Sequence, residues 1–443
     1  MGALRGLTRR VAGAMSIFSG TQAFTILCSI LRTKFIAVWA GQAGIGVLAI
    51  YLAAVELLSS GGTVGLRTAA VRLVSVAGAS ARRSVCRAVT RLSWIVGLAL
   101  GLFTALCSPV LNLIAFGQLR WSWPFALLGI VVICAVVSAG KQAQLQGLRR
   151  LGNIAWGYVT SGVLSLAVAI PVIMTLGRES ILPVVLLYGV VGAAVFLVPQ
   201  RMKVPLARKP APGCARAIMR LGAYLTAAAV MEWMCEYAFL SWLRAAAGEG
   251  TVGLYQAGHT LSARYIGMVF TALSMEFYPR IAAASRSRMR TALFVNHELR
   301  LVTCVAAPLA VLFIAAVPWC VRLVYSAEFL AVTDFVRIAV PATMLRAASW
   351  CMGFVILSRD RGRVYLLVEA LSAVLTLGLN ILFYGKMGLT GLGWAYLASY
   401  LLYAPVVWAI CRRRYGIGLS RPTVLLLVGA LALTFGAALF LVF

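Results

Sequence analysis

The sequence is poor in charged residues, and in acidic ones above all. Only 12% of its 443 residues are charged, and 11 Asp and Glu residues stand against 40 Lys and Arg residues. Soluble globular proteins are about 25% charged and about half apolar, whereas this chain is 62% hydrophobic. A soluble fold of this size could not hide so much apolar surface, because surface area falls too slowly with mass. The composition predicts that lipid surrounds much of the chain.

Patterns for metal, disulfide and nucleic-acid binding are missing as well. The ten cysteines form no CxxC pair and no cluster with the two histidines, and most lie inside apolar runs. We interpret them as small buried apolar residues and expect no metal site and no disulfide framework. The net charge of +29 comes from basic residues scattered over many segments, without a recognition module. This pattern indicates basic loops at the cytoplasmic face of a membrane, not a nucleic-acid partner.

Long apolar runs dominate what is present. A helix needs about 20 apolar residues to cross a bilayer, and alternating segments of the barrel type are absent. The connecting loops are too short to form a soluble catalytic domain. The predicted spans cover residues 13–39, 45–66, 93–116, 121–140, 152–176, 180–199, 218–244, 251–275, 301–323, 330–357, 364–384, 388–410 and 423–443.

The distribution of basic residues sets the expected orientation. With a cytoplasmic N-terminus, 30 of the 40 Lys and Arg residues fall in inward-facing segments, five in outward-facing ones and five inside spans. Positive residues are retained on the cytoplasmic side of membrane proteins, and here the bias alternates from loop to loop. The chain is therefore predicted to be a multi-pass protein of the bacterial inner membrane with its N-terminus in the cytoplasm.

A short repeat suggests two halves. Residues 40–48 read AGQAGIGVL and residues 247–255 read AGEGTVGLY, with glycines at matching places (Gly41 and Gly46, Gly248 and Gly253). Glycine permits a tight helix reversal with positive φ. The fold class expected is an all-α polytopic membrane protein with two six-helix lobes, related by a pseudo-two-fold axis around a central cavity. The lobes would be residues 1–200 and 217–411, with a cytoplasmic linker at 201–216 and an additional helix in 412–443.

Polar residues inside the first span follow one face of a helix. At 100° per residue, one side of this helix carries Ser19, Gln22, Thr25, Ser29 and Arg32. Such a stripe should face water or another polar surface. Lys34 also lies in this span, on nearly the opposite side from Arg32.

Ionisable residues in other spans are costly in lipid and point to function. They are Glu56, Glu232, Glu236, His259, Arg264, Asp334, Arg337, Arg346 and Glu369. We interpret Gln22, Ser29 and the basic residues as the lining of an aqueous cavity for an anionic head group. The candidates for a coupling cation, H⁺ or Na⁺, are Glu56, Glu232, Glu236, Asp334 and His259; no other cofactor is expected. The alternative is that these charges pair and lock helices together, as Asp334 and Arg337, three residues apart, easily could.

Residues 30–75 resemble the opening of the polysaccharide flippases. The similar elements are the run from Arg32 to Ala37, the turn from Gly41 to Gly46, and a small-residue second helix that leads to Arg67 and Arg72. Residues 385–403, GKMGLTGLGWAYLASYLLY, are similar in style. The chain thus looks like a Wzx-type O-antigen translocase of the multidrug/oligosaccharidyl-lipid/polysaccharide exporter superfamily, although many members have Pro where this chain has Gln42 or Ala43.

This resemblance implies a function. Such a protein moves an undecaprenyl-pyrophosphate-linked oligosaccharide from the inner to the outer leaflet by alternating access, and is not an enzyme. By matching positions, Arg32, Lys34 and Arg67 would contact the substrate. Partners would be this substrate and membrane lipid, and could include other polysaccharide assembly proteins. The alternatives are a lipid II flippase, a multidrug or cation exporter of the same superfamily, and a membrane glycan polymerase.

Overall fold

The structure of the chain, a computed structural model, is helical. It describes residues 20–21, 24–76, 82–118, 122–148, 150–198, 212–265, 277, 281, 284, 287–359 and 362–442. Within these ranges there is no strand, since backbone groups in lipid must be satisfied inside each segment. The predicted all-α membrane fold is confirmed.

The helices follow one another with short connections. Residues 24–39 are helical, and the chain continues through α2 (Gly41–Val76), α3 (Arg82–Phe116), α4 (Trp123–Gly147), α5 (Leu151–Leu176), the 3-10 turn η1 (Gly177–Ser180) and α6 (Ile181–Leu197). After α7 (Pro212–His259) and the π-helical turn η2 (Thr260–Tyr265) come α9 (Arg288–Val324), the 3-10 turn η3 (Ala327–Val332), α10 (Thr333–Ala339), α11 (Ala342–Ser358), α12 (Gly362–Tyr415) and α13 (Arg421–Val442).

The chain divides into two compact units, residues 1–246 and 247–443. The division falls inside α7, next to the kink at Gly248, so the first part of α7 belongs with the first unit. From the sequence, this part was assigned to the second lobe, beginning at residue 217. Whether the lobes move as 1–200 and 217–411 stays a prediction.

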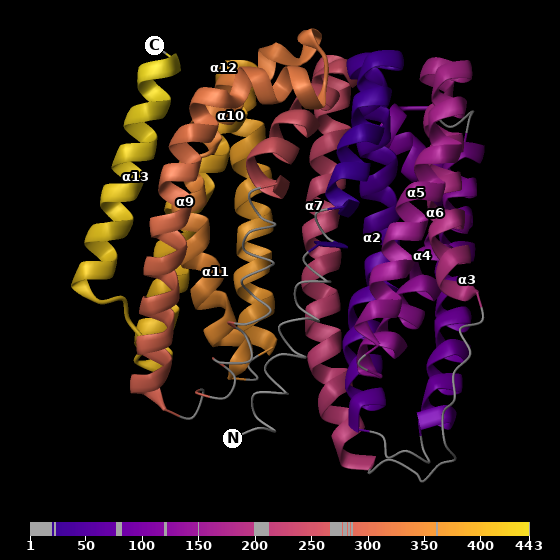
Figure 1. Cartoon of the computed structure of the whole chain (residues 1–443), viewed down its shortest axis with the longest axis horizontal. Coiled ribbons are helices and arrows are strands. Elements are labelled where there is room, and N and C mark those ends of the chain that lie inside the picture. Colours follow the sequence, from indigo (N-terminus) through magenta and orange to yellow (C-terminus); the bar gives the residue numbers. More distant parts are fainter. Residues whose placement is uncertain are drawn as a thin grey trace. The chain divides into compact units, whose positions relative to one another are not determined.

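In the first unit, α4 is the central helix, with α2, α3 and α6 packed against it (Figure 1). Small residues let α3 and α4 approach closely: a Cβ on Gly129 would lie 2.6 Å from the carbonyl oxygen of Gly101. This close contact suits a membrane, where packing, and not the hydrophobic effect, holds helices together. Tyr237 of α7 joins the bundle by donating a hydrogen bond to the Leu111 carbonyl over 2.7 Å.

In the second unit, α13 lies alongside α9 (Figure 1). Arg300 of α9 donates hydrogen bonds to Thr423 Oγ1 (2.8 Å) and Ser420 Oγ (2.7 Å). Asn296, one turn earlier, accepts a hydrogen bond from the Ser420 amide over 2.7 Å. These bonds secure the start of α13, so the helix predicted as an addition to the lobes is an integrated part of this unit.

Glycine makes the helix reversals that the repeat predicted. Gly41 (φ 67°) and Gly248 (φ 83°) both adopt the left-handed conformation. Gly388, in the segment 385–403, repeats the arrangement with φ 61° and breaks α12 into two halves. A residue with a Cβ rarely adopts this conformation, so glycine is required at each reversal.

Large apolar side chains cover the outside of several helices. On α3, Leu98, Leu102 and Leu106 are 53%, 63% and 71% exposed, and Trp319 of α9 is 76% exposed. An exposed apolar surface of this extent in a soluble protein would drive aggregation. It fits helices that are surrounded by acyl chains.

Seven helices of the described part are long and apolar enough to cross a membrane, or up to eight if a bent pair forms one span. Two of them, residues 152–197 and α12, each contain two predicted spans. The bent pair lies at the predicted span 330–357 and shows that its helix is broken. The chain turns by 57° between α10 and α11. Pro341 lies at this break, where it lacks an amide hydrogen and would clash with the preceding turn of a continuous helix.

Candidate functional site

The helix at residues 24–39 carries Arg32, the basic residue of the predicted polar stripe. Arg32 is half-buried, and its guanidinium carbon lies 4.3 Å from the centre of the Tyr188 ring on α6. Attraction to the negative face of an aromatic ring is worth about 0.5–2 kcal/mol, rising as water is excluded. One turn earlier, Cys28 packs against Gly162 of α5. Arg32 thus faces α6 from a helix that also contacts α5.

Tyr158 of α5 extends this arrangement. Its hydroxyl donates a hydrogen bond to Gln142 Oε1 of α4 over 2.7 Å. Tyr188 and Arg67, the latter from α2, both lie close enough to interact electrostatically with Tyr158. We call this group the arginine–tyrosine patch; it consists of Arg32, Tyr188, Tyr158, Gln142 and Arg67.

The patch is positively charged and rich in hydrogen-bonding groups. Its members come from the helix at residues 24–39 and from α2, α4, α5 and α6, all within the first unit. No Asp or Glu occurs in the sequence between Glu56 and Glu179. Guanidinium groups offer a planar fork of donors that matches phosphate oxygens, and tyrosine and glutamine can both donate to and accept from hydroxyl groups. The patch can therefore accept an anionic, hydroxyl-rich ligand.

A second polar cluster lies in the second unit around Arg346 of α11. Arg346 is half-buried and donates hydrogen bonds to the Ala263 carbonyl (2.7 Å) and to the Tyr396 hydroxyl (3.3 Å). His259 packs edge-on against Tyr396, with ring centres 6.3 Å apart, and stacks on Tyr255. Arg346, predicted for the cavity, and His259, predicted for a coupling cation, thus meet at the same tyrosine.

Three tyrosines carry this cluster along α12. Tyr396, Tyr400 and Tyr403 recur at helical spacing and contact one another edge-on, with ring centres 5.2 and 6.2 Å apart. At the far end, the Tyr403 hydroxyl donates to Glu369 Oε1 over 3.5 Å. The reversal at Gly388 brings Glu369, from the first half of α12, beside the second half. We call Arg346, Tyr396, Tyr400, Tyr403 and Glu369 the tyrosine ladder.

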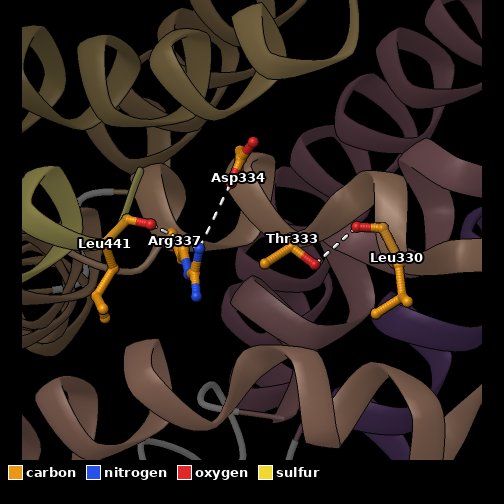
Figure 2. Close-up of polar contacts among 5 residues, drawn as sticks. All are labelled: Leu330, Thr333, Asp334, Arg337 and Leu441. Atoms are coloured by element: carbon orange, nitrogen blue, oxygen red, sulfur yellow. Dashed lines mark hydrogen bonds and ion pairs between the residues drawn. The ribbon is translucent and has the colours of Figure 1, made fainter. Parts of the chain in front are cut away.

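Arg337 has a different environment (Figure 2). Its Nη1 lies 3.7 Å from Asp334 Oδ1 and donates a hydrogen bond to the Leu441 carbonyl of α13 over 2.8 Å. The Arg337 side chain is 15% exposed and that of Asp334 is 50% exposed. The pairing of these residues, predicted as the alternative to a cavity role, is confirmed. Arg337 also links the α10 helix to the last turn of α13.

The other predicted site residues are spread over several helices. Ser29 and Lys34 are half-buried on the helix that carries Arg32, Glu236 is half-buried on α7, and Glu56 and Glu232 are exposed. Lys34, Glu56, Glu232 and Glu236 each have an interaction partner. Gln22 and the side chain of Arg264 lie outside the described residues. Within the described ranges, no group of three His, Cys, Asp or Glu residues could hold a metal ion.

Sequence reasoning missed the tyrosines and Gln142. The predictions selected formally charged groups, whereas Tyr158 and Tyr188 lie in otherwise apolar spans that give no periodic signal. The tyrosine ladder did leave a signal, since Tyr396, Tyr400 and Tyr403 fall on one helix face. Their partnership with Glu369 depends on the fold of α12 at Gly388, which only the structure shows.

Comparison with known proteins gives one family and one fold. A family model described as "Polysaccharide biosynthesis protein" matches residues 41–334. No curated protein is similar enough to be matched.

Solved structures of transporters are similar throughout their length. An inward-facing multidrug resistance MATE family transporter of the MOP superfamily shares 14% identity at a TM-score of 0.73, with 88% of this chain and 94% of that chain covered. An outward-facing one also shares 14% identity, at a TM-score of 0.66, with 91% and 95% covered. A MOP superfamily transporter from Pyrococcus furiosus, described as having a binding pocket of reverse polarity, shares 14% identity at a TM-score of 0.67, again with 91% and 95% covered. At such identities the similarity establishes the fold.

Proposed function

Because the chain belongs to the family of polysaccharide biosynthesis proteins and has the fold of MOP superfamily transporters, we propose that it is a flippase for a lipid-linked oligosaccharide. The substrate is an undecaprenyl-pyrophosphate-linked repeat unit of an O-antigen or a similar polysaccharide. The protein moves it from the cytoplasmic to the periplasmic leaflet of the bacterial inner membrane by alternating access. The resemblance at residues 30–75 agrees with the family match, which begins within that segment.

The arginine–tyrosine patch carries this proposal. A pyrophosphate cannot cross hydrocarbon unaided, because the ideal cost of moving an ion into a medium of low dielectric constant reaches tens of kcal/mol. Arg32 and Arg67 offset this cost with charge-assisted hydrogen bonds to phosphate oxygens. Tyr188 and Tyr158 each offer an apolar ring face and a hydroxyl group, which suits a sugar ring with its mixture of C–H and O–H groups.

A coupling cation drives the movement in one direction. We place H⁺ or Na⁺ at the acidic residues predicted from the sequence, Glu232 and Glu236 first, since they are one turn apart on α7. In the second unit, His259 beside Tyr396 and Glu369 at the end of the tyrosine ladder offer groups that exchange protons. Intramembrane acids and histidines form proton relays in many transporters.

The proposal is tested by locating the lipid-linked precursor in cells. Deletion of the gene is expected to leave the precursor facing the cytoplasm, and the wild-type copy should return it to the outer leaflet. The Arg32→Ala variant should not return the precursor to the outer leaflet. The matched control, Arg413→Ala at an exposed position on α12, should return it. Precursor on the outer leaflet of deletion cells, unpolymerised, would instead identify a glycan polymerase.

The same experiment separates the transport alternatives. A lipid II flippase would leave peptidoglycan precursor, and not polysaccharide precursor, on the cytoplasmic side. A solved structure of similar fold is a multidrug transporter, so an exporter of drugs or cations is a further alternative. Loss of such an exporter would leave both precursors in their normal leaflets. It would instead raise the sensitivity of the deletion cells to toxic cations.

A further inference from the structure

The first unit contains a cavity that the proposed transport path does not use. It has a volume of about 380 Å³ and lies between the beginning of α3 and the end of α4. Its lining includes Arg83, Arg87, Thr90, Arg91, Lys141 and Gln144. None of these residues belongs to the arginine–tyrosine patch.

Three of the four basic residues come from one face of α3. Arg83, Arg87 and Arg91 are four residues apart, so their side chains follow one another along the helix. All three are exposed, and Lys141 of α4 is half-buried. The cavity is thus bounded on two sides by cationic groups.

Two hydrogen bonds join α3 and α4 at the cavity. Gln144 of α4 is 2% exposed, and its Nε2 donates to the Cys86 carbonyl (3.0 Å) and to Thr90 Oγ1 (2.8 Å) of α3. Val89 of α3 and Ala143 of α4 pack in a small apolar core. The positions of the basic residues are therefore set by a rigid contact of α3 with α4.

The two helices that line this cavity contain no acidic residue to balance its positive charge. No acidic residue occurs between Glu56 and Glu179, so neither α3 nor α4 contains one. Among the residues that the structure describes, no carboxylate forms an ion pair with these four cations. Four neighbouring cations repel one another, and this repulsion is relieved when an anion binds among them.

The position of the cavity indicates the source of that anion. The predicted spans 93–116 and 121–140 end next to it, on the side where the basic loops place the cytoplasm. The cavity therefore lies at the level of the lipid head groups. Basic pockets between membrane helices on the cytoplasmic side bind anionic head groups, and the volume lies in the range of small-ligand sites, about 300–1,000 Å³.

We propose that this cavity binds the phosphate of an anionic phospholipid of the inner leaflet. The guanidinium groups of α3 hold the phosphate oxygens, Lys141 adds a further positive charge, and the acyl chains remain in the bilayer beside α3. The site holds a lipid that remains in its leaflet, and it is separate from the transported substrate.

The test uses the full-length protein in detergent, with phosphatidylglycerol as the probe and phosphatidylcholine as the neutral comparison. Native mass spectrometry and thermal unfolding report bound lipid and stabilisation. The wild-type protein should bind phosphatidylglycerol and unfold at a higher temperature in its presence. Arg87→Gln with Arg91→Gln should weaken this binding by roughly 10- to 30-fold. The matched control, Arg413→Gln with Arg414→Gln, removes two exposed basic residues of α12 and should leave binding unchanged.

Three results would overturn the proposal. The first is equal stabilisation by phosphatidylglycerol and phosphatidylcholine, and the second is equal affinity in the Arg87/Arg91 variant and the wild type. The third is full competition by inorganic phosphate at millimolar concentration, which would identify a site for a soluble anion.

Arg87→Lys with Arg91→Lys retains both charges and should keep most of the affinity, which excludes misfolding as the cause of a loss. Translocation is measured in parallel, so failure of this proposal leaves the flippase proposal standing.

Discussion

The arginines of the two units lie in different surroundings. In the first unit, the half-buried Arg32 lies over the Tyr188 ring, and the exposed Arg67 interacts with Tyr158. In the second unit, the interior cations have partners within the unit: Arg346 binds a carbonyl and a tyrosine, and Arg337 binds a carboxylate and a carbonyl. In our proposal, the first arrangement leaves positive charge for the substrate, whereas the second holds helices together.

We expect translocation to fall most when both arginines of the arginine–tyrosine patch are neutralised. Arg32→Gln with Arg67→Gln removes both guanidinium groups of the arginine–tyrosine patch. Translocation should fall by about 100-fold or more, since charge-assisted hydrogen bonds are about twice as strong as neutral ones and each 1.4 kcal/mol is a factor of about ten. The rate of precursor movement in reconstituted vesicles measures it. A double variant with normal flux would place the head-group site elsewhere.

The next effect distinguishes the ring of Tyr188 from its hydroxyl. Tyr188→Ala removes the aromatic face beneath Arg32 and should lower translocation by about 3- to 10-fold, given a cation–π contribution of about 0.5–2 kcal/mol. Tyr188→Phe keeps the face and should stay near the wild-type rate. Equal losses in both variants would mean that the hydroxyl, and not the stacking, is what matters.

In the second unit, we expect replacement of Arg346 to lower the stability of the protein more than its affinity for substrate. Arg346→Met leaves the Ala263 carbonyl and the Tyr396 hydroxyl without their donor, and should destabilise the protein by about 1–3 kcal/mol. Thermal unfolding in detergent measures this change, with Arg413→Met as the control. The comparison between the units fails if Arg346→Met weakens substrate binding while unfolding stays normal.

The smallest effect concerns the pair in Figure 2. Asp334→Asn removes an ion pair whose carboxylate is half-exposed and 3.7 Å from its partner, so the change in stability should be about 0–1 kcal/mol. Arg337→Ala should cost more, because it also removes the hydrogen bond to α13. Unfolding temperatures of the two variants test this order. The reverse order would show that the carboxylate has a role beyond this pair.

The helical membrane architecture could be predicted from the sequence, because the bilayer itself requires apolar spans and basic cytoplasmic loops. Gly41 and Gly248 were found as reversals from their spacing alone, and both have positive φ. The break at Pro341 was missed because an apolar run continues through it; a proline can kink a membrane helix without interrupting its hydropathy. The proline itself was the available signal.

The candidate site was only partly accessible from the sequence. Charged residues in spans are rare enough to be selected individually, so Arg32, Arg346 and His259 were identified. Their neighbours were not, because Tyr188, Tyr158 and Gln142 come from three different helices whose lateral order is decided by packing. The periodic pattern of one helix does not specify which residues of a neighbouring helix will lie against it.

In our proposal, the first unit recognises the pyrophosphate head group. Binding of undecaprenyl pyrophosphate to the purified protein in nanodiscs tests it most directly, with wild type, Arg32→Gln and Arg87→Gln/Arg91→Gln compared at one salt concentration. We predict that Arg32→Gln lowers the affinity by about 10-fold or more, while the Arg87/Arg91 variant binds like the wild type. Unchanged affinity in Arg32→Gln would contradict the claim.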